Sequence, residues 1–145
     1  MIHLGAALLC DAVTVRENLL HVLGGGVTRL PRPGFPAPLA AEVALLLYVD
    51  GEPGVEVTHR VTGECRLRGT DDAPIFAFEY TLRTVLGSEE GAQSVSAVLP
   101  LGNVGVPAAG AYEITISVDE MPVGRIPFTA ILDETLLPSW DDPAN

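Results

Sequence analysis

The chain has 145 residues, of which 48% are hydrophobic, and it carries a formal net charge of −11 at pH 7. That length suits a single domain with a full core, and the hydrophobic content excludes a disordered chain. The basic residues are all arginines, scattered along an acidic sequence, which argues against nucleic acid and anionic membrane surfaces as partners.

The first residues are apolar, but they lack the basic region of a signal peptide and are interrupted by Asp11. No segment reaches the about 18 uncharged apolar residues that a membrane helix needs. We therefore expect a cytoplasmic protein. Cys10 and Cys65 lie far apart and form no CxxC pair, which favours buried free thiols over a zinc or redox site.

The first two predicted strands cover residues 4–15 and 19–30. The segment 4–15 is apolar on both faces, which favours a central place in a sheet. Gly24–Gly26 follow a strand as a phosphate-binding loop would, but the GK[ST] ending and a following helix are missing. We interpret these glycines as a backbone device that allows a bulge, a positive φ or close approach of another chain.

A proline-rich connection, residues 31–38, leads to the third predicted strand, 41–50, which is also apolar on both faces. We expect this strand at the sheet centre or under that connection. The fourth, 55–68, alternates most regularly between apolar and polar residues. His59 stands on its apolar face, where a neutral imidazole needs a hydrogen-bond partner. Gly63, on the same face, is the expected place for a bulge or bend.

Four further strands are predicted at 75–86, 93–100, 110–118 and 123–132, with turn residues between them. These patterns predict an all-β domain, a single antiparallel two-sheet sandwich that is immunoglobulin-like and has about eight strands. The domain would span residues 1–132, and an acidic tail would follow at 133–145. One buried core is expected to contain Val57, Val61, Phe76, Phe78, Tyr112, Ile114 and Ile116.

Two parts of the sequence resemble a bacterial family of short proteins described only as a domain of unknown function. The hairpin from Cys10 to Leu23, with the run Gly24–Leu30 after it, resembles the opening of that family. The residues from Pro100 through Tyr112 to Phe128 are similar to its closing hairpin and to that of many immunoglobulin-like sandwiches. The resemblance covers most of residues 6–131, implies a β-sandwich, and carries no catalytic residue.

The sequence contains no recognisable catalytic motif. No serine lies in a GxSxG motif, and Cys10 shares a face with Leu8 and Ala12, as a packed thiol does. We therefore expect neither an enzyme nor a cofactor. The favoured function is a binding or assembly module that presents loops, a strand edge or its tail to a protein partner or to itself. Alternatives are a calcium-binding sandwich and, less favoured, a carboxylate-dependent hydrolase.

Two regions are candidate binding sites. If successive strands cross the sandwich in alternating directions, every second connection lies at the same end. Calcium takes about six to eight oxygen ligands, and acidic turns at one end could supply them. Those candidate metal ligands are Asp50, Glu52, Glu89, Glu90, Asp119 and Glu120. Trp140, the only tryptophan, lies in the tail, where we expect it to pack on the domain or to anchor a partner.

Overall fold

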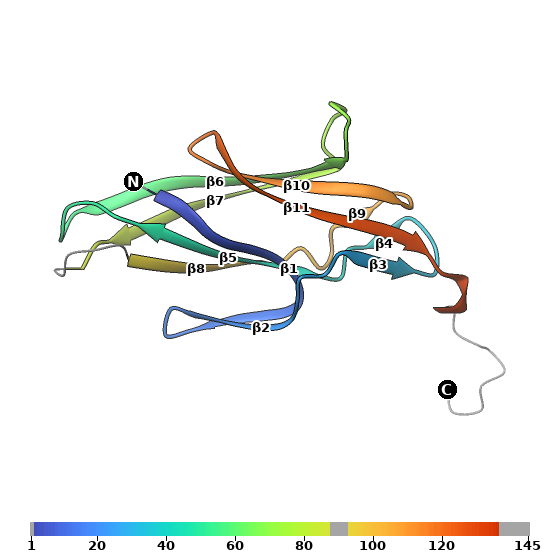
Figure 1. Cartoon of the computed structure of the whole chain (residues 1–145), viewed down its shortest axis with the longest axis horizontal. Coiled ribbons are helices and arrows are strands. Elements are labelled where there is room, and N and C mark those ends of the chain that lie inside the picture. Colours follow the sequence, from blue (N-terminus) through green and yellow to red (C-terminus); the bar gives the residue numbers. More distant parts are fainter. Residues whose placement is uncertain (1, 88–92, 137–145) are drawn as a thin grey trace.

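The computed structural model describes residues 2–87 and 93–136 of the chain (Figure 1). These residues form an all-β fold, as the alternation predicts, with one 3₁₀ turn, η1 (Glu134–Leu136). None of them forms a helix that is long and apolar enough to cross a membrane. The strands are β1 (Ile2–Arg16), β2 (Leu19–Gly25), β3 (Arg29–Arg32), β4 (Ala37–Pro38), β5 (Glu42–Val49), β6 (Glu56–Leu67), β7 (Phe76–Val85), β8 (Gln93–Leu99), β9 (Gly105–Val106), β10 (Gly110–Val118) and β11 (Met121–Leu132).

The described residues contain eleven strands, more than the eight predicted. The predicted strand 19–30 is split into β2 and β3, and the two-residue strands β4 and β9 pair with each other inside irregular connections. Gly24 and Gly26 have φ values of 61° and 86°, which confirms that these glycines supply a positive φ. Such conformations interrupt a strand, so the chain leaves one sheet here and joins another.

Two sheets hold all the strands except β4 and β9. One is antiparallel and has the order β2–β1–β5–β8, whereas the other has the order β3–β11–β10–β6–β7. In the second sheet β3 runs parallel to β11, while the remaining pairs are antiparallel. The prediction of a purely antiparallel fold is therefore wrong at β3, because the chain reaches this sheet by a crossover and not by a hairpin.

One hydrophobic core draws on both of these sheets. Val43 and Leu45 of β5 contribute from the first sheet, and Ile114 of β10 and Phe128 of β11 from the second. The core prediction is confirmed, since the period-two pattern fixes which face each side chain takes. Of the seven predicted residues, Val61, Tyr112, Ile114 and Ile116 are buried, and Val57, Phe76 and Phe78 are partly buried and pack against them.

The long strand β1 has two different partners along its length. Residues 2–10 pair with β5, whereas residues 10–16 pair with β2 to form a hairpin. This hairpin lies on the opposite side of β5 and β8 from β6 and β10 (Figure 1). Cys10, Val13 and Ala44 form a second, smaller core there, with Leu20, Val22 and Val98 packed on it.

The second core explains why the segments 4–15 and 41–50 are apolar on both faces. β5 takes the central position that its composition predicts, between β1 and β8. Its inner face packs in the main core, while Ala44 on its outer face packs in the second core. The hairpin of β1 and β2 therefore contributes to covering that outer face.

Gly63 does not introduce the expected bulge. β6 pairs with β7 and with β10 across this residue without a register shift. A Cβ atom at Gly63 would lie 1.9 Å from Cζ of Phe78, the residue directly opposite on β7. The glycine is thus explained by the aromatic ring lying over it. Register irregularities occur instead in β1, between Leu4 and Ala6, and in the pairing of β10 with β11, between Ile116 and Ser117.

Candidate functional site

The strands at the ends of the two main sheets are the first candidates for binding. They are β2 and β8 in one sheet and β3 and β7 in the other. An end strand exposes unpaired N–H and C=O groups, to which another chain can add as a further strand. β7 has ten residues, compared with seven in β2 and β8 and four in β3.

The edge of β8 is occupied by the turn that joins β1 to β2. The side-chain amide of Asn18 donates to the Ser94 carbonyl (2.6 Å) and accepts from the Ser96 N–H (3.2 Å). The Ser96 hydroxyl in turn donates to the Asn18 carbonyl at 3.0 Å. The amide therefore takes the place that a neighbouring peptide group would take along β8.

The other two end strands carry local features that oppose pairing. β3 is short and contains Pro31, which has no N–H to donate. β2 ends in Gly24 and Gly25, and the positive φ of Gly24 breaks the extended conformation. Regular pairing along β2 would therefore be limited to the residues before Gly24.

β7 has none of these obstructions. It pairs with β6 from Phe76 to Val85 without a register shift, and it contains no proline. Among the described residues β6 is its sole partner strand. Its side chains alternate between the core side, with Phe76, Phe78, Tyr80 and Leu82, and the solvent side, with Ala77, Glu79, Thr81, Arg83 and Val85.

The hydrogen bonds of β6 show which groups of β7 face outward. The N–H of Arg60 donates to Oδ1 of Asp119 (2.9 Å), and its carbonyl accepts from the Asp119 N–H (2.8 Å). Both groups of Arg60 thus point toward β10, so those of the neighbouring residue Val61 point toward its β7 partner, Tyr80.

The outward-facing groups of β7 therefore belong to its odd-numbered residues. Even-numbered residues such as Tyr80 use their N–H and C=O groups to pair with β6. The bond from the Leu86 N–H to the Val55 carbonyl, at 3.3 Å, agrees with this phase just beyond the end of the strand. The odd-numbered residues from 77 to 85 consequently present both their backbone groups and their side chains to solvent.

His59 has the hydrogen-bond partner that the sequence analysis requires, and it lies near the start of β6, just before the residues that pair with β10. Its Nδ1 is 2.6 Å from Oδ2 of Asp119, and its side chain is 18% exposed. The pKa of Asp119 is lowered, first by the hydrogen bond from the Arg60 N–H and then by that from His59. In the described part of the chain no serine, threonine or cysteine side chain hydrogen-bonds to His59.

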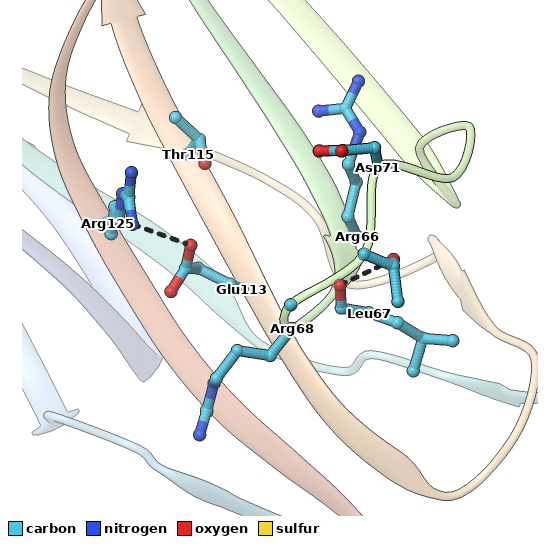
Figure 2. Close-up of a pocket in the computed structure, with 9 residues that line it drawn as sticks. Arg66, Leu67, Arg68, Asp71, Glu113, Thr115 and Arg125 are labelled. Carbon is cyan, nitrogen blue, oxygen red and sulfur yellow. Dashed lines mark hydrogen bonds and ion pairs between the residues drawn. The ribbon is translucent and has the colours of Figure 1, made fainter.

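A hollow of about 470 Å³ lies beside the ends of β6 and β10, and it is lined by three of the arginines. Figure 2 shows that the guanidinium groups of Arg66, Arg68 and Arg125 point in different directions. Asp71 and Glu113 line the same hollow. The arginines therefore do not converge on one point, as a clamp for an anion would require.

Each of these arginines also has a protein partner. Arg66 donates to the Asp72 carbonyl at 2.9 Å. Arg125 lies 3.7 Å from a carboxylate oxygen of Glu113 (Figure 2). Arg68 donates to a main-chain carbonyl at 3.4 Å. Since the guanidinium groups diverge and each contacts a protein partner, we assign no ligand to this hollow.

The acidic turns do not form a cation site among the described residues. No group of three or more His, Cys, Asp or Glu side chains could hold a metal ion there. The β5–β6 and β10–β11 connections lie toward the same end of the molecule, as alternating strand directions require (Figure 1). The Asp119 carboxylate is engaged by His59 and Arg60. Glu89, Glu90 and Trp140 lie outside the described residues, so the calcium site and the tail anchor stay predictions.

Both cysteines are buried free thiols, as the sequence analysis predicts. Burial raises the pKa of the Cys65 thiol to about 12 and also raises that of Cys10. A thiol with a raised pKa is a poor nucleophile at neutral pH. Neither cysteine is therefore a candidate catalytic residue.

The family model of DUF6941, a family of unknown function, matches residues 5–131. The chain belongs to this family. The match runs from β1 to β11 and confirms the resemblance to a family without an assigned activity. No curated protein matches this DUF6941 chain at a significant level.

Sequence reasoning did not single out β7 of this DUF6941 domain as a site. Its alternation identified a strand with one buried face, but the same pattern fits a central and an end strand. Asn18 lies between the predicted strands 4–15 and 19–30, and nothing local indicates that its side chain reaches β8. No proline interrupts the ten alternating residues of β7, but a central strand lacks proline in the same way, so no local signal could have found this edge.

Proposed function

We propose that this protein is a non-enzymatic assembly module that binds an extended protein strand along the free edge of β7. The observation that carries the proposal is the contrast between the end strands. β8 is capped by Asn18 and β3 contains Pro31, whereas β7 offers ten regular residues. Strand addition gains affinity from main-chain hydrogen bonds and specificity from alternate side chains.

We further propose that the two main sheets form an immunoglobulin-like sandwich with β7 at its border. The order β3–β11–β10–β6–β7, with β3 parallel to β11, supports this arrangement. The hydroxyl of Tyr112 donates to the Ala108 carbonyl at 2.7 Å, near the start of β10, which resembles the tyrosine corner of such folds. We place the module in the cytoplasm, since free thiols suit a reducing compartment.

The test uses the outward-facing N–H of Thr81, in the middle of β7. Thr81→Pro removes a donor from the free edge, and it leaves the bonds between β6 and β7 in place because Thr81 does not pair with β6 through that group. Thr81→Ala is the matched control, since it shortens the side chain and keeps the N–H. Equal thermal midpoints of the two variants establish that both are folded.

The probe is a phage-displayed library of random ten-residue peptides selected on the wild-type domain. We expect enriched peptides that bind wild type and Thr81→Ala with similar Kd values and that bind Thr81→Pro at least about tenfold more weakly, a loss of about 1.4 kcal/mol. A library that yields no binder at concentrations where the domain is monomeric, or binders that bind Thr81→Pro as tightly as wild type, would contradict strand addition at β7.

A further inference from the structure

Resting on the proposed function, we infer that the strand bound at the β7 edge is β7 of a second copy of this chain. The two strands would run antiparallel, and a twofold axis would pass beside Thr81. A twofold interface is self-complementary, because the same residues contribute from both copies. Each five-stranded sheet would thereby continue into that of the other copy.

The solvent-facing side chains on the two sides of Thr81 are complementary to each other, so two copies of β7 can pair with themselves. In this register Glu79 of one copy lies opposite Arg83 of the other, and the same pair recurs on the other side of the axis. Ala77 lies opposite Val85, whose side chain is 56% exposed in the single chain. Opposite charges and paired apolar groups at directly opposed positions stabilise antiparallel strands.

The pleat and the charges together select this register. A register shift of one residue would bring core-side residues opposite solvent-side ones. The nearest alternatives are therefore shifts of two residues, which move the twofold axis from Thr81 to Tyr80 or to Leu82. With the axis at Tyr80, Glu79 lies opposite Thr81, and with the axis at Leu82 it lies opposite Val85. Both alternatives lose the pairs between Glu79 and Arg83.

The backbone hydrogen-bonding groups of β7 point in the directions that this register requires. The odd-numbered residues of β7 direct their N–H and C=O groups to the free edge, as the bonds of Arg60 and Leu86 establish. Thr81 would therefore face Thr81 of the second copy as a hydrogen-bonded pair, in which both residues exchange N–H···O=C bonds. Glu79 and Arg83 would form the next such pairs.

The charged groups of β7 are available for these contacts. Arg83 is exposed, and among the described residues its side chain makes no hydrogen bond or ion pair. Glu79 is about half exposed and accepts from Nη2 of Arg60 at 2.8 Å through one oxygen, Oε2. Its other oxygen remains free to accept from Arg83 of the second copy.

Charge exchange tests the inference by sedimentation equilibrium at about 0.15 M salt, where charges more than about 8 Å apart are largely screened. We expect wild type to dimerise and E79R and R83E each to raise the dimer Kd at least about tenfold, because each places two like-charged pairs across the axis. The double variant E79R/R83E restores both opposite-charge pairs and should dimerise again. An equimolar mixture of the two single variants should form heterodimers.

A disulfide test checks the axis itself. Thr81→Cys should form an intermolecular disulfide on mild oxidation, because hydrogen-bonded antiparallel residues have Cα atoms about 5.5 Å apart, within disulfide range. Arg83→Cys is the matched control and should not crosslink, since its two copies lie on opposite sides of the axis. Crosslinking at residue 83 but not at 81 would overturn the register.

A wild-type chain that is monomeric at all concentrations up to about 0.5 mM, near the weak end of specific protein association, would overturn the inference. So would a mixture of E79R and R83E that does not associate. If the selected peptides still bind Thr81→Pro more weakly than wild type in that case, the proposed function stands with a different partner. If they do not, both fail.

Discussion

At the residue scale, several polar side chains link backbone segments that are distant in the sequence. Asp119 is 60 positions from His59, yet its two carboxylate oxygens accept from His59 and from the Arg60 N–H. The tight turn at Asp119 and Glu120, both with positive φ, is thereby tied to the start of β6. The histidine that the sequence marked as needing a partner is thus a structural link between a turn and a strand.

Gly63→Ala should destabilise the domain by about 1–3 kcal/mol, as overpacking of a filled site does. The new methyl group would lie 1.9 Å from Cζ of Phe78, so the ring must move. Urea denaturation measures the change. Gly34→Ala is the control, because no atom lies within 4 Å of a Cβ at that position.

The double variant Gly63→Ala with Phe78→Leu separates the ring contact from a backbone effect. We expect the two substitutions to be less than additive, since the smaller side chain leaves room for the methyl group. Full additivity would show that Phe78 is not the reason for the glycine.

At the scale of the elements, the end strands differ in how their free edges are treated. β8 receives the side chain of Asn18 and the carbonyl of the same residue, which hold the tip of the β1–β2 hairpin against it. β7 receives no such partner within the described residues. Under the proposed function, edge-to-edge association would therefore be directed to one strand, and protecting the other edges is how natural sheets control unwanted pairing.

Asn18→Gly should weaken the attachment of the hairpin and lower the free energy of unfolding by about 1–3 kcal/mol, since it removes two hydrogen bonds of the amide. Glycine adopts the φ of 58° found at this position without strain, so the change isolates the side chain. Hydrogen exchange of the Ser96 amide should speed up in the variant. Ser96→Ala, which removes one hydroxyl hydrogen bond and keeps the N–H, is the control. An unchanged exchange rate of the Ser96 amide in Asn18→Gly would show that the Asn18 side chain does not protect the edge of β8.

At the scale of the whole molecule, the fold has two cores of unequal size on the two faces of β5. The larger joins both sheets, and the smaller joins the β1–β2 hairpin to β5 and β8. Since the larger core draws on both sheets, neither sheet can lose its partner without exposing apolar surface. We therefore expect the two sheets to unfold together.

Ile114→Ala should lower the free energy of unfolding by about 2–5 kcal/mol, because it leaves a cavity where a fully buried side chain packs in the main core. Tyrosine fluorescence and far-ultraviolet circular dichroism should report the same urea midpoint in wild type and variant. Separate midpoints for the two probes would contradict a single shared core. Leu132→Ala, at a side chain that is 51% exposed, is the control and should have a smaller effect.

The sequence by itself determined the class of the fold and the side of each strand that is buried, because a period of two is a local property of the pleated chain. It also placed the chain in its family, which has no assigned function. The tertiary structure decided the order of the strands, the parallel direction of β3, the packing of the β1–β2 hairpin on β5, and the place of β7 at the end of the described sheet. These features depend on which segments become neighbours, as with Asn18 and Ser96, which lie 78 positions apart and meet because the hairpin folds back onto β8.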